Sequence, residues 1–277
     1  MAAAVEGTPV VQSPDDDSQP VSVLAKVHLL LSAFTHGTTT LGLTALSRRS
    51  GVSKGSAHRL ASELVELGYL ARSLKGYQLG WRMFELGQLV PGAAGLRDVA
   101  RPALQDLRMA CHAVVHLAVP QGAECVYLER IAGRRELGII DAVADRVPNY
   151  STASGRIFLA HSAPETIANL NRTALAKLGV QHHGELAALF AEIRERRYAE
   201  ERSQCLWGFK SISVPVMNPG TDDVIASVSV TVPVDRKNVQ ELVHALWATS
   251  ADISRGLLRR SSSAYRAEAP RPVRLVS

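Results

Sequence analysis

Apolar residues recur every three or four positions in three consecutive segments between residues 23 and 67, a spacing that predicts three amphipathic helices. The stripes are Val23, Leu24, Val27, Leu30, Leu31 and Phe34 in the first segment, LTALSRRS in the second, and Ala57, Leu60, Ala61, Leu64 and Leu67 in the third. Ser53 is the expected N-cap of the third helix, and Gly51 and Gly68 are expected to end the second and third.

A short hairpin is predicted directly after these helices. The stretch YLARSLKGYQLG contains two extended runs, 69–72 and 77–79, around a turn at Lys75 and Gly76. Runs of this length around a glycine turn are typical of paired strands. Three helices followed by a hairpin is the order of a winged helix-turn-helix, so we expect one such domain over residues 23–87.

Beyond residue 87 the pattern predicts a linker helix and then a mixed domain. Leu96, Val99, Ala103, Leu104 and Leu107 have helical spacing, so we expect a linker helix over 88–109 that is interrupted at Pro102 and restarts there. Strands are expected at 114–119, 126–131 and 137–141, and helices near 154–161, 164–170 and 185–196. Two further strands, FKSISVPV and VIASVSVTV, are joined by a turn at Pro219 and Gly220, and a last helix follows over 238–258.

Short connections between strands predict a mainly antiparallel sheet with helices packed on it, so the expected class is α+β, with a second domain over 110–260. The first 22 residues, rich in Pro, Ser, Asp and small side chains, are expected to be a disordered tail, and 261–277 a flexible one.

The chain carries no sign of a membrane or an export segment. No apolar run approaches the roughly 18 to 20 residues that span a bilayer, and the first 20 residues contain acids where a signal peptide contains bases. We therefore expect a cytoplasmic protein. Cys111, Cys125 and Cys205 are odd in number and far apart, which favours reduced core thiols over a disulfide or a metal site.

Basic residues concentrate in the N-terminal domain. Residues 1–20 contain four acids and no Lys or Arg, whereas 21–90 contain eight bases against three acids. Residues at the start of the second helix of a helix-turn-helix reach DNA bases and phosphates. In this chain that helix is the third predicted one. The candidates are Ser53, Lys54, Ser56, His58, Arg59 and Ser62 on it, Arg48 and Arg49 before it, and Arg72 and Lys75 in the hairpin. A solvated amphipathic helix is the alternative for the helix taken alone.

The stretch LTALSRRSGVSKGSAHRLASELVELGYLARSLKGYQLG resembles the DNA-binding domain of the isocitrate lyase regulator (IclR) family. STASGRIFLA, RRYAEERSQCLWGFKSISVPV and DDVIASVSVTVPV resemble segments of the family's effector-binding domain, so the resemblance covers roughly 23–258. It implies a transcriptional regulator, more often a repressor, that binds a palindromic operator as a homodimer or homotetramer. Gly55, Ser203 and Gln204 depart from the family pattern.

Polar and apolar residues alternate along the two strands near the C-terminus, where Ser227, Ser229 and Thr231 point to one face and the intervening valines to the other. From the residues alone, a half-solvated sheet is the simpler interpretation. The resemblance instead implies a GAF-like domain that holds a small organic effector, aromatic or carboxylic, at Ser154, Gly155, Glu201, Ser211, Ser229 and Thr231. The amides at the start of the 154–161 helix are expected to donate to a ligand carboxylate. Glu201 is expected either to bind a ligand hydroxyl or amine or to be protonated.

Enzyme motifs are absent from the sequence. The one Gly-x-Ser-x-Gly match, GVSKG at 51–55, joins two predicted helices and does not follow a strand, so it is no nucleophile elbow. There is no Gly-rich phosphate loop or metal-spaced His cluster, and His112, His116, His182 and His183 are expected to be ordinary histidines. We expect no catalytic residue, cofactor or metal. Two alternatives stay open: an enzyme whose N-terminal helices only dimerise, and a constitutive DNA-binding protein that has no ligand.

Overall fold

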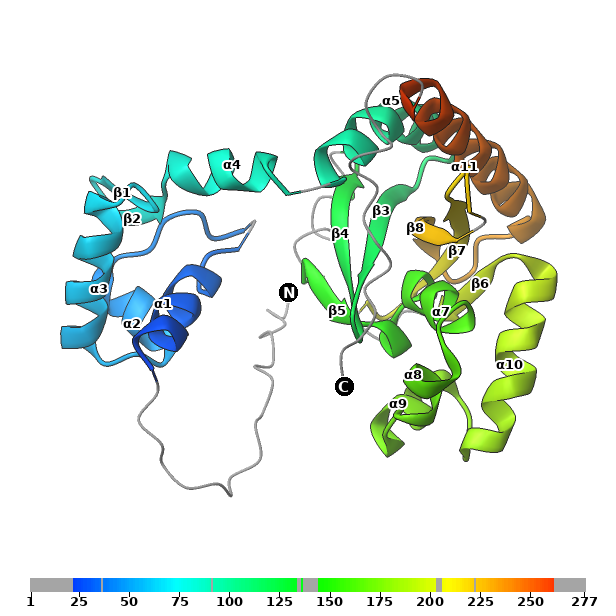
Figure 1. Cartoon of the computed structure of the whole chain (residues 1–277), viewed down its shortest axis with the longest axis horizontal. Helices are drawn as coiled ribbons and strands as arrows, with labels where there is room; N and C mark the ends of the chain where they lie inside the picture. The colour runs from blue at the N-terminus through cyan, green and yellow to red at the C-terminus, as the bar shows by residue number, and fades with distance from the viewer. Residues whose placement is uncertain are drawn as a thin grey trace. The chain divides into compact units, whose positions relative to one another are not determined.

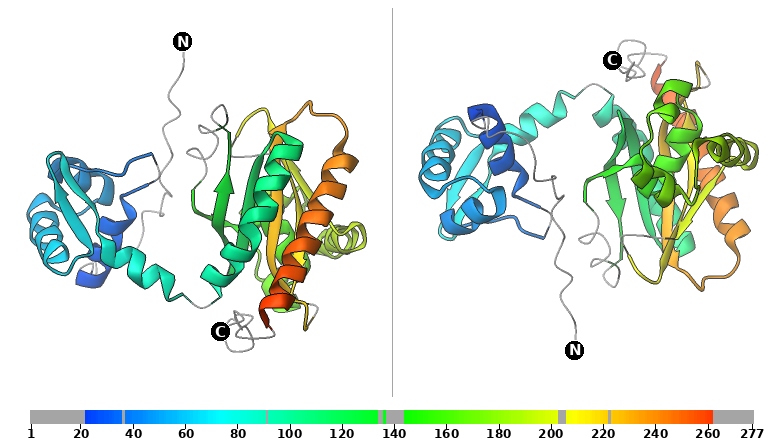
Figure 2. Two further views of the ribbon diagram at one scale, coloured as in Figure 1. Left: turned by 90° about the horizontal axis from the view of Figure 1, so that it is seen from above. Right: turned by 90° about the horizontal axis from the view of Figure 1, so that it is seen from below.

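The structure is a computed structural model that describes residues 22–35, 37–90, 92–133, 136, 144–202, 206–221 and 223–261. The chain divides into two compact units, Met1–Val90 and Pro91–Ser277, which are drawn in Figures 1 and 2. The strand expected over 137–141, Cys205, and most of both expected tails lie outside the described residues.

The N-terminal unit contains the three predicted helices and the predicted hairpin. The elements are α1 (Val23–Ser32), α2 (Leu43–Ser50), α3 (Lys54–Glu66), β1 (Leu70–Ser73), β2 (Gly76–Leu79) and α4 (Trp81–Gln88). Leu30, Leu46, Leu60 and Leu70 are fully buried between them. Gly51 ends α2 in the left-handed conformation, with φ 68°, which glycine adopts at little cost. The prediction of three helices and an antiparallel hairpin is therefore confirmed.

Two details of α3 differ from the prediction. Leu67 was expected to complete the apolar stripe, but it lies one residue beyond the helix and is 58% exposed. Ser53 occupies the N-cap position, yet its hydroxyl donates to the Ser56 hydroxyl and accepts no backbone N–H of the helix. The first turn of α3 therefore lacks a side-chain cap, which leaves its amides available.

The helix α4 was not predicted. Gly80 precedes it without a side-chain cap, and none of its residues is buried. Trp81 is 79% and Phe84 is 56% exposed, and their rings meet edge to face with centroids 6.1 Å apart. A short helix with an exposed aromatic face gives no core stripe from which the pattern could have identified it.

The C-terminal unit is built on a six-stranded antiparallel sheet with the order β5-β4-β3-β8-β7-β6. The strands are β3 (Val114–Gln121), β4 (Glu124–Ile131), β5 (Arg146–Pro148), β6 (Ala199–Arg202), β7 (Phe209–Met217) and β8 (Val224–Pro233). The helices are α5 (Ala93–Cys111), α7 (Ala153–Ala160), α8 (Pro164–Ala168), α9 (Arg172–Leu178), α10 (His183–Arg196) and α11 (Val239–Ser261), with a 3-10 turn, η1 (Asn149–Ser151), before α7.

Both faces of this sheet are covered. On one face, Val228, Val230 and Val232 of β8 belong to the core formed with α5 and α11. On the other face, Ser227, Ser229 and Thr231 are buried, and Ser229 meets Ser154 at the start of α7. Figure 2 shows α5 and α11 along one side of the sheet and α7 on the opposite side. The interpretation of these strands as a half-solvated sheet is therefore wrong, because the polar face is buried.

Several C-terminal elements were missed or misjudged. The strands β5 and β6 and the helix α9 were not predicted. Pro102 lies inside α5 without interrupting it, because Ala100 and Leu104 on either side are fully buried against the sheet and hold the helix continuous. Among the described residues, no helix has the length and apolar character needed to cross a membrane.

Candidate functional sites

The candidate DNA-contacting residues of α3 lie on the side of the helix that faces away from its core. Ala57, Leu60, Ala61 and Leu64 are buried, whereas Ser53, Lys54, His58 and Arg59 are exposed, and Ser56 and Ser62 are half-buried. The helix thus presents hydroxyl, imidazole, ammonium and guanidinium groups along one surface. Such groups bind phosphates and the edges of bases.

The β1–β2 hairpin, which forms the wing of the winged helix-turn-helix, and α2 add further cations to the N-terminal unit. Arg72 of β1 donates to the Ser62 hydroxyl of α3 at 3.3 Å and lies over the Tyr77 ring, 5.5 Å from its centroid. This bond connects the wing to α3, which is the recognition helix of the helix-turn-helix. Lys75 is exposed at the wing tip, and Arg48 and Arg49 are exposed in the last turn of α2.

A small cavity lies between the polar face of the sheet and the segment that leads into α7. It has a volume of about 20 Å³ and is lined by His116, Tyr127, Ser151, Thr152, Ser154, Glu201, Leu206, Ser211, Ser229 and Thr231. Five of the six predicted effector residues therefore line one cavity. A water molecule needs roughly 10 to 15 Å³ of such space, so this conformation accommodates about one.

The hydroxyl groups around the cavity form short contacts with one another. Ser154 Oγ lies 3.3 Å from both Ser213 Oγ and Ser229 Oγ, so the start of α7 is bonded to β7 and β8. Ser211 Oγ and Thr231 Oγ1 lie 2.9 Å apart on the same two strands. Hydroxyls can donate or accept, so these groups can exchange their mutual bonds for bonds to a ligand.

Gly155, the sixth predicted residue, serves a packing role in this conformation. Its amide donates to Thr152 Oγ1 at 3.0 Å, so it is occupied by the helix N-cap and not offered to a carboxylate as predicted. A Cβ at this position would lie 2.0 Å from the Asn149 carbonyl oxygen. Glycine therefore allows α7 to approach η1 closely enough to close the cavity.

The sequence analysis missed the other five residues that line the cavity, which are His116, Tyr127, Ser151, Thr152 and Leu206. His116 of β3 is in register with Ser229 of β8, and its ring lies 5.1 Å from that of Tyr127 on β4. Burial, together with the charge of Arg130, lowers the pKa of His116 to about 3, so its imidazole is neutral. Alternation along β3 was the available signal, but it identifies a face and not the neighbour on β8.

Arg130 and Tyr127 form a buried cationic group beside the cavity. The Arg130 guanidinium lies 4.6 Å from the Tyr127 ring centroid and 3.3 Å from the Asp145 carboxylate. Burial lowers the pKa of Arg130, and the charge of Asp145 opposes that effect. The stack of Arg130, Tyr127 and His116 therefore places positive potential behind one wall of the cavity.

Glu201 places a carboxylate at the opposite side. It is buried on β6, in register with Ser211 of β7. The pKa of Arg156 on α7 is lowered by burial, and the charge of Glu201 counteracts this lowering. The cavity is thus polar at both ends, with an imidazole and a phenol near one and a carboxylate near the other.

The two cysteines in the described part of the chain are ordinary buried thiols. Cys111 and Cys125 are buried and free, and burial raises the pKa of the Cys125 thiol to about 11. Such a thiol is unreactive at neutral pH. Over the described ranges, no group of three or more His, Cys, Asp and Glu side chains is arranged to hold a metal ion.

A winged helix-turn-helix joined to a sheet domain with a polar internal cavity defines a ligand-responsive DNA-binding transcriptional regulator. The chain belongs to the IclR family. The model of the IclR helix-turn-helix domain matches residues 23–73, and the model of the bacterial transcriptional regulator IclR C-terminal domain matches residues 90–255. The family and the fold class predicted from the sequence are thereby confirmed.

Similar proteins are transcriptional regulators. The chain is 34% identical to the HTH-type transcriptional regulator KipR of Bacillus subtilis over 158 residues, which are 56% of this chain. The match spans 63% of KipR, less than two thirds of that protein. It is 27% identical to the HTH-type transcriptional regulator XynR of Escherichia coli over 221 residues, 78% of this chain and 87% of that protein.

One solved structure has a similar fold over most of the chain. It is an IclR homologue from Microbacterium hydrocarbonoxydans complexed with 4-hydroxybenzoate, with a TM-score of 0.73, 27% sequence identity, and coverage of 86% of this chain and 100% of that one. The likeness extends over both units.

Proposed function

We propose that this chain is a repressor that binds a palindromic operator through α3 and the β1–β2 wing and is released by a small organic acid. The observation that carries the proposal is the burial of Ser229 and Thr231 under the start of α7, where they line a cavity with His116 and Glu201. Their hydroxyls bond only to other side-chain hydroxyls in this conformation, and such groups can exchange those bonds for bonds to a ligand.

The α3 surface supports DNA binding by charge and by geometry. Lys54 and Arg59 are exposed on the same helix as the Ser56 and Ser62 hydroxyls, and Arg72 of the wing is bonded to Ser62. We infer that the start of α3 enters the major groove, while Arg48, Arg49, Arg72 and Lys75 bind phosphates. His58 and Ser53 complete the proposed contact set.

The polarity of the cavity favours a hydroxylated or aromatic carboxylic acid as effector. Its hydroxyls and the Tyr127 phenol can donate to a carboxylate, and the Glu201 carboxylate can accept from a ligand hydroxyl. The relative that is complexed with 4-hydroxybenzoate carries both groups on its ligand. Because the cavity holds only about 20 Å³, the effector must bind a more open conformation and thereby increase its population.

The exposed aromatic face of α4 supports assembly into a dimer. Trp81 and Phe84 lie on α4, and Leu89 and Val90 directly after it are also exposed. Large apolar patches on a soluble protein mark contact surfaces. Leu96, Ala100 and Leu104 of α5 are buried in the core of the C-terminal unit and cannot contact a second copy, so we place the dimer contact on α4. A tetramer of two such dimers is compatible with this proposal.

Operator binding with and without effector tests the function. Fluorescence anisotropy of a duplex from the promoter region beside the gene should give a dissociation constant that weakens when 4-hydroxybenzoate or a related acid is added. Tighter binding with effector would indicate an activator or co-repressor. Operator binding that no acid changes would favour the constitutive DNA-binding protein, and absence of DNA binding would favour the enzyme.

A further inference from the structure

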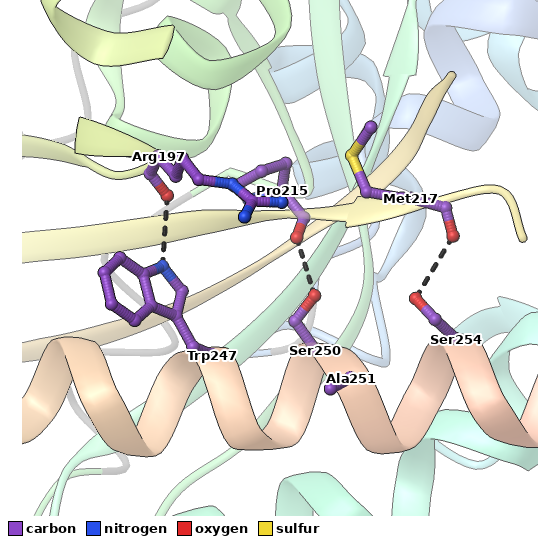
Figure 3. A pocket seen from close by; sticks show the side chains of 7 residues that line it. All are labelled: Arg197, Pro215, Met217, Trp247, Ser250, Ala251 and Ser254. Carbon is purple, nitrogen blue, oxygen red and sulfur yellow. Dashed lines mark hydrogen bonds between the residues drawn. The ribbon is translucent and has the colours of Figure 1, made fainter. Parts of the chain in front are cut away.

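A second hollow lies between β7, the end of α10 and α11. It has a volume of about 430 Å³ and is lined by Arg197, Pro215, Met217, Trp247, Ser250, Ala251 and Ser254. Figure 3 shows Arg197, Pro215 and Met217 along one side of it and the α11 residues along the other. Small-molecule sites commonly measure about 300 to 1,000 Å³, so this hollow can take a ligand without opening.

The hollow results from the way the β6–β7 pairing ends. The two strands pair from Lys210 to Ser213 on β7, and continuing that register would set Pro215 opposite Arg197. Proline has no N–H to donate to a neighbouring strand. Arg197 adopts the left-handed conformation at the end of α10, with φ 59°, and directs the chain away from β7. Space is therefore left between the β7 edge, the end of α10 and α11.

Three hydrogen bonds fix the walls of this space. Trp247 Nε1 donates to the Arg197 carbonyl at 3.3 Å, Ser250 Oγ donates to the Pro215 carbonyl at 2.6 Å, and Ser254 Oγ donates to the Met217 carbonyl at 3.1 Å (Figure 3). With their protons used in this way, both serine oxygens keep lone pairs that can accept from a ligand. The walls are thus preorganised around an opening that has acceptors on one side.

The Arg197 guanidinium supplies the charge. It forms no ion pair or side-chain hydrogen bond with any residue in the described part of the chain. An arginine binds a carboxylate with two parallel hydrogen bonds, and the indole of Trp247 and the Met217 and Ala251 side chains offer apolar contact. We propose that this hollow is a second small-molecule site that takes an organic carboxylate with an aromatic or branched apolar body.

Fluorine NMR of the full-length protein labelled with 5-fluorotryptophan gives a local test. The chain has three tryptophans, Trp81, Trp207 and Trp247, so three resonances can be assigned from single Trp→Phe variants. Titration with phenylacetate should shift the Trp247 resonance in a saturable manner. Phenylacetamide, the neutral isostere, should bind at least about tenfold more weakly than phenylacetate, because it lacks the charge that pairs with arginine.

Variants at the end of α10 make the test specific. Arg197→Asn removes the cation and suits the left-handed backbone, which asparagine tolerates, and it should weaken phenylacetate binding about tenfold or more. Arg196→Gln, at an exposed arginine paired with Glu192, should leave the titration unchanged. A Trp247 resonance that stays unmoved by phenylacetate, or equal affinity in wild type and Arg197→Asn, would overturn the proposal. A change of sedimentation mass in unliganded Arg197→Asn would overturn it too, by assigning the hollow to a contact between copies of the chain.

Discussion

Ser211 Oγ and Thr231 Oγ1 lie 2.9 Å apart on adjacent strands, beside the cavity between the sheet and the segment that leads into α7. The two side chains are in register across the β7–β8 pair. Each hydroxyl has one proton and two lone pairs, so their mutual bond leaves capacity that a single water or a ligand atom can use. Removing hydroxyls from this part of the sheet therefore tests whether the cavity binds a ligand.

Removing the hydroxyl partners should weaken effector binding. Ser229→Ala and Thr231→Val should each reduce the affinity for an effector acid by about 0.5 to 1.5 kcal/mol, because each deletes a buried hydrogen-bonding group. Calorimetric titration measures the change. Thr173→Val, at an exposed position of α9, is the matched control and should be silent. Unchanged affinity in both cavity variants, with operator binding intact, would remove the effector from this cavity.

The recognition helix should depend on Arg59. Its guanidinium lies 3.7 Å from the Glu63 carboxylate, and both side chains are exposed. An exposed helix pair of this kind contributes only about 0.3 to 0.5 kcal/mol, so DNA can replace it. Arg59→Ala should weaken operator binding by about 1 to 3 kcal/mol in anisotropy at fixed salt.

Two further variants separate contact from general charge. Glu63→Gln should leave operator binding unchanged or slightly tighter, because it releases Arg59 and removes a negative charge. Arg172→Ala removes an exposed cation from α9 in the other unit and should have no effect. Equal losses in Arg59→Ala and Arg172→Ala would contradict a specific role for α3.

The sequence predicted those parts of the fold that depend on local periodicity. The alternation of Ser227 to Val232 identified a strand with two different faces, and Gly51 identified the end of α2. It did not establish that the polar face is buried, because the covering helix α7 starts about 75 residues earlier in the chain. Only the family resemblance supplied that point. Pro102 was misjudged because burial of its neighbours overrides a local helix-breaking tendency.

The missed cavity residues show where local patterns stop being informative. His116 meets Ser229 only through the pairing of β3 with β8, which no short motif encodes. Tyr127 enters the cavity through the β3–β4 hairpin, where the register shifts between Leu117 and Ala118. Such a shift changes which side chains face one another, so Tyr127 could not be assigned a face from its own strand.

The α4 surface should hold two copies of the chain together. Phe84→Glu should weaken the dimer by about 2 kcal/mol or more, roughly thirtyfold in dissociation constant, because it places an unpaired charge in an apolar contact. Sedimentation velocity over a micromolar concentration range measures it. Leu74→Glu, at the exposed wing tip, is the control and should sediment as wild type. A wild-type chain that is monomeric both free and on DNA would contradict the α4 dimer.

His116 should make the stability of the C-terminal unit fall in mild acid. Its pKa is about 3 in the folded protein against about 6.5 in an unfolded chain. The groups around it are the Arg130 guanidinium, the Tyr127 phenol and, across the cavity, the Glu201 carboxylate. A lowered pKa means that folding favours the neutral imidazole. The resulting stabilisation is present above pH 6.5 and is lost progressively as pH falls toward 3.

At pH 5 the loss from this one group should be about 2 kcal/mol relative to pH 7.5, because the unfolded chain takes up a proton that the folded protein excludes. Denaturant unfolding at the two pH values measures it. His116→Gln cannot titrate, so the difference between its unfolding free energies at the two pH values should be smaller than that of wild type by this amount. Carboxylates elsewhere contribute equally to both proteins and cancel in the comparison. Equal pH dependence of wild type and His116→Gln would show that the imidazole is not held neutral in the folded protein.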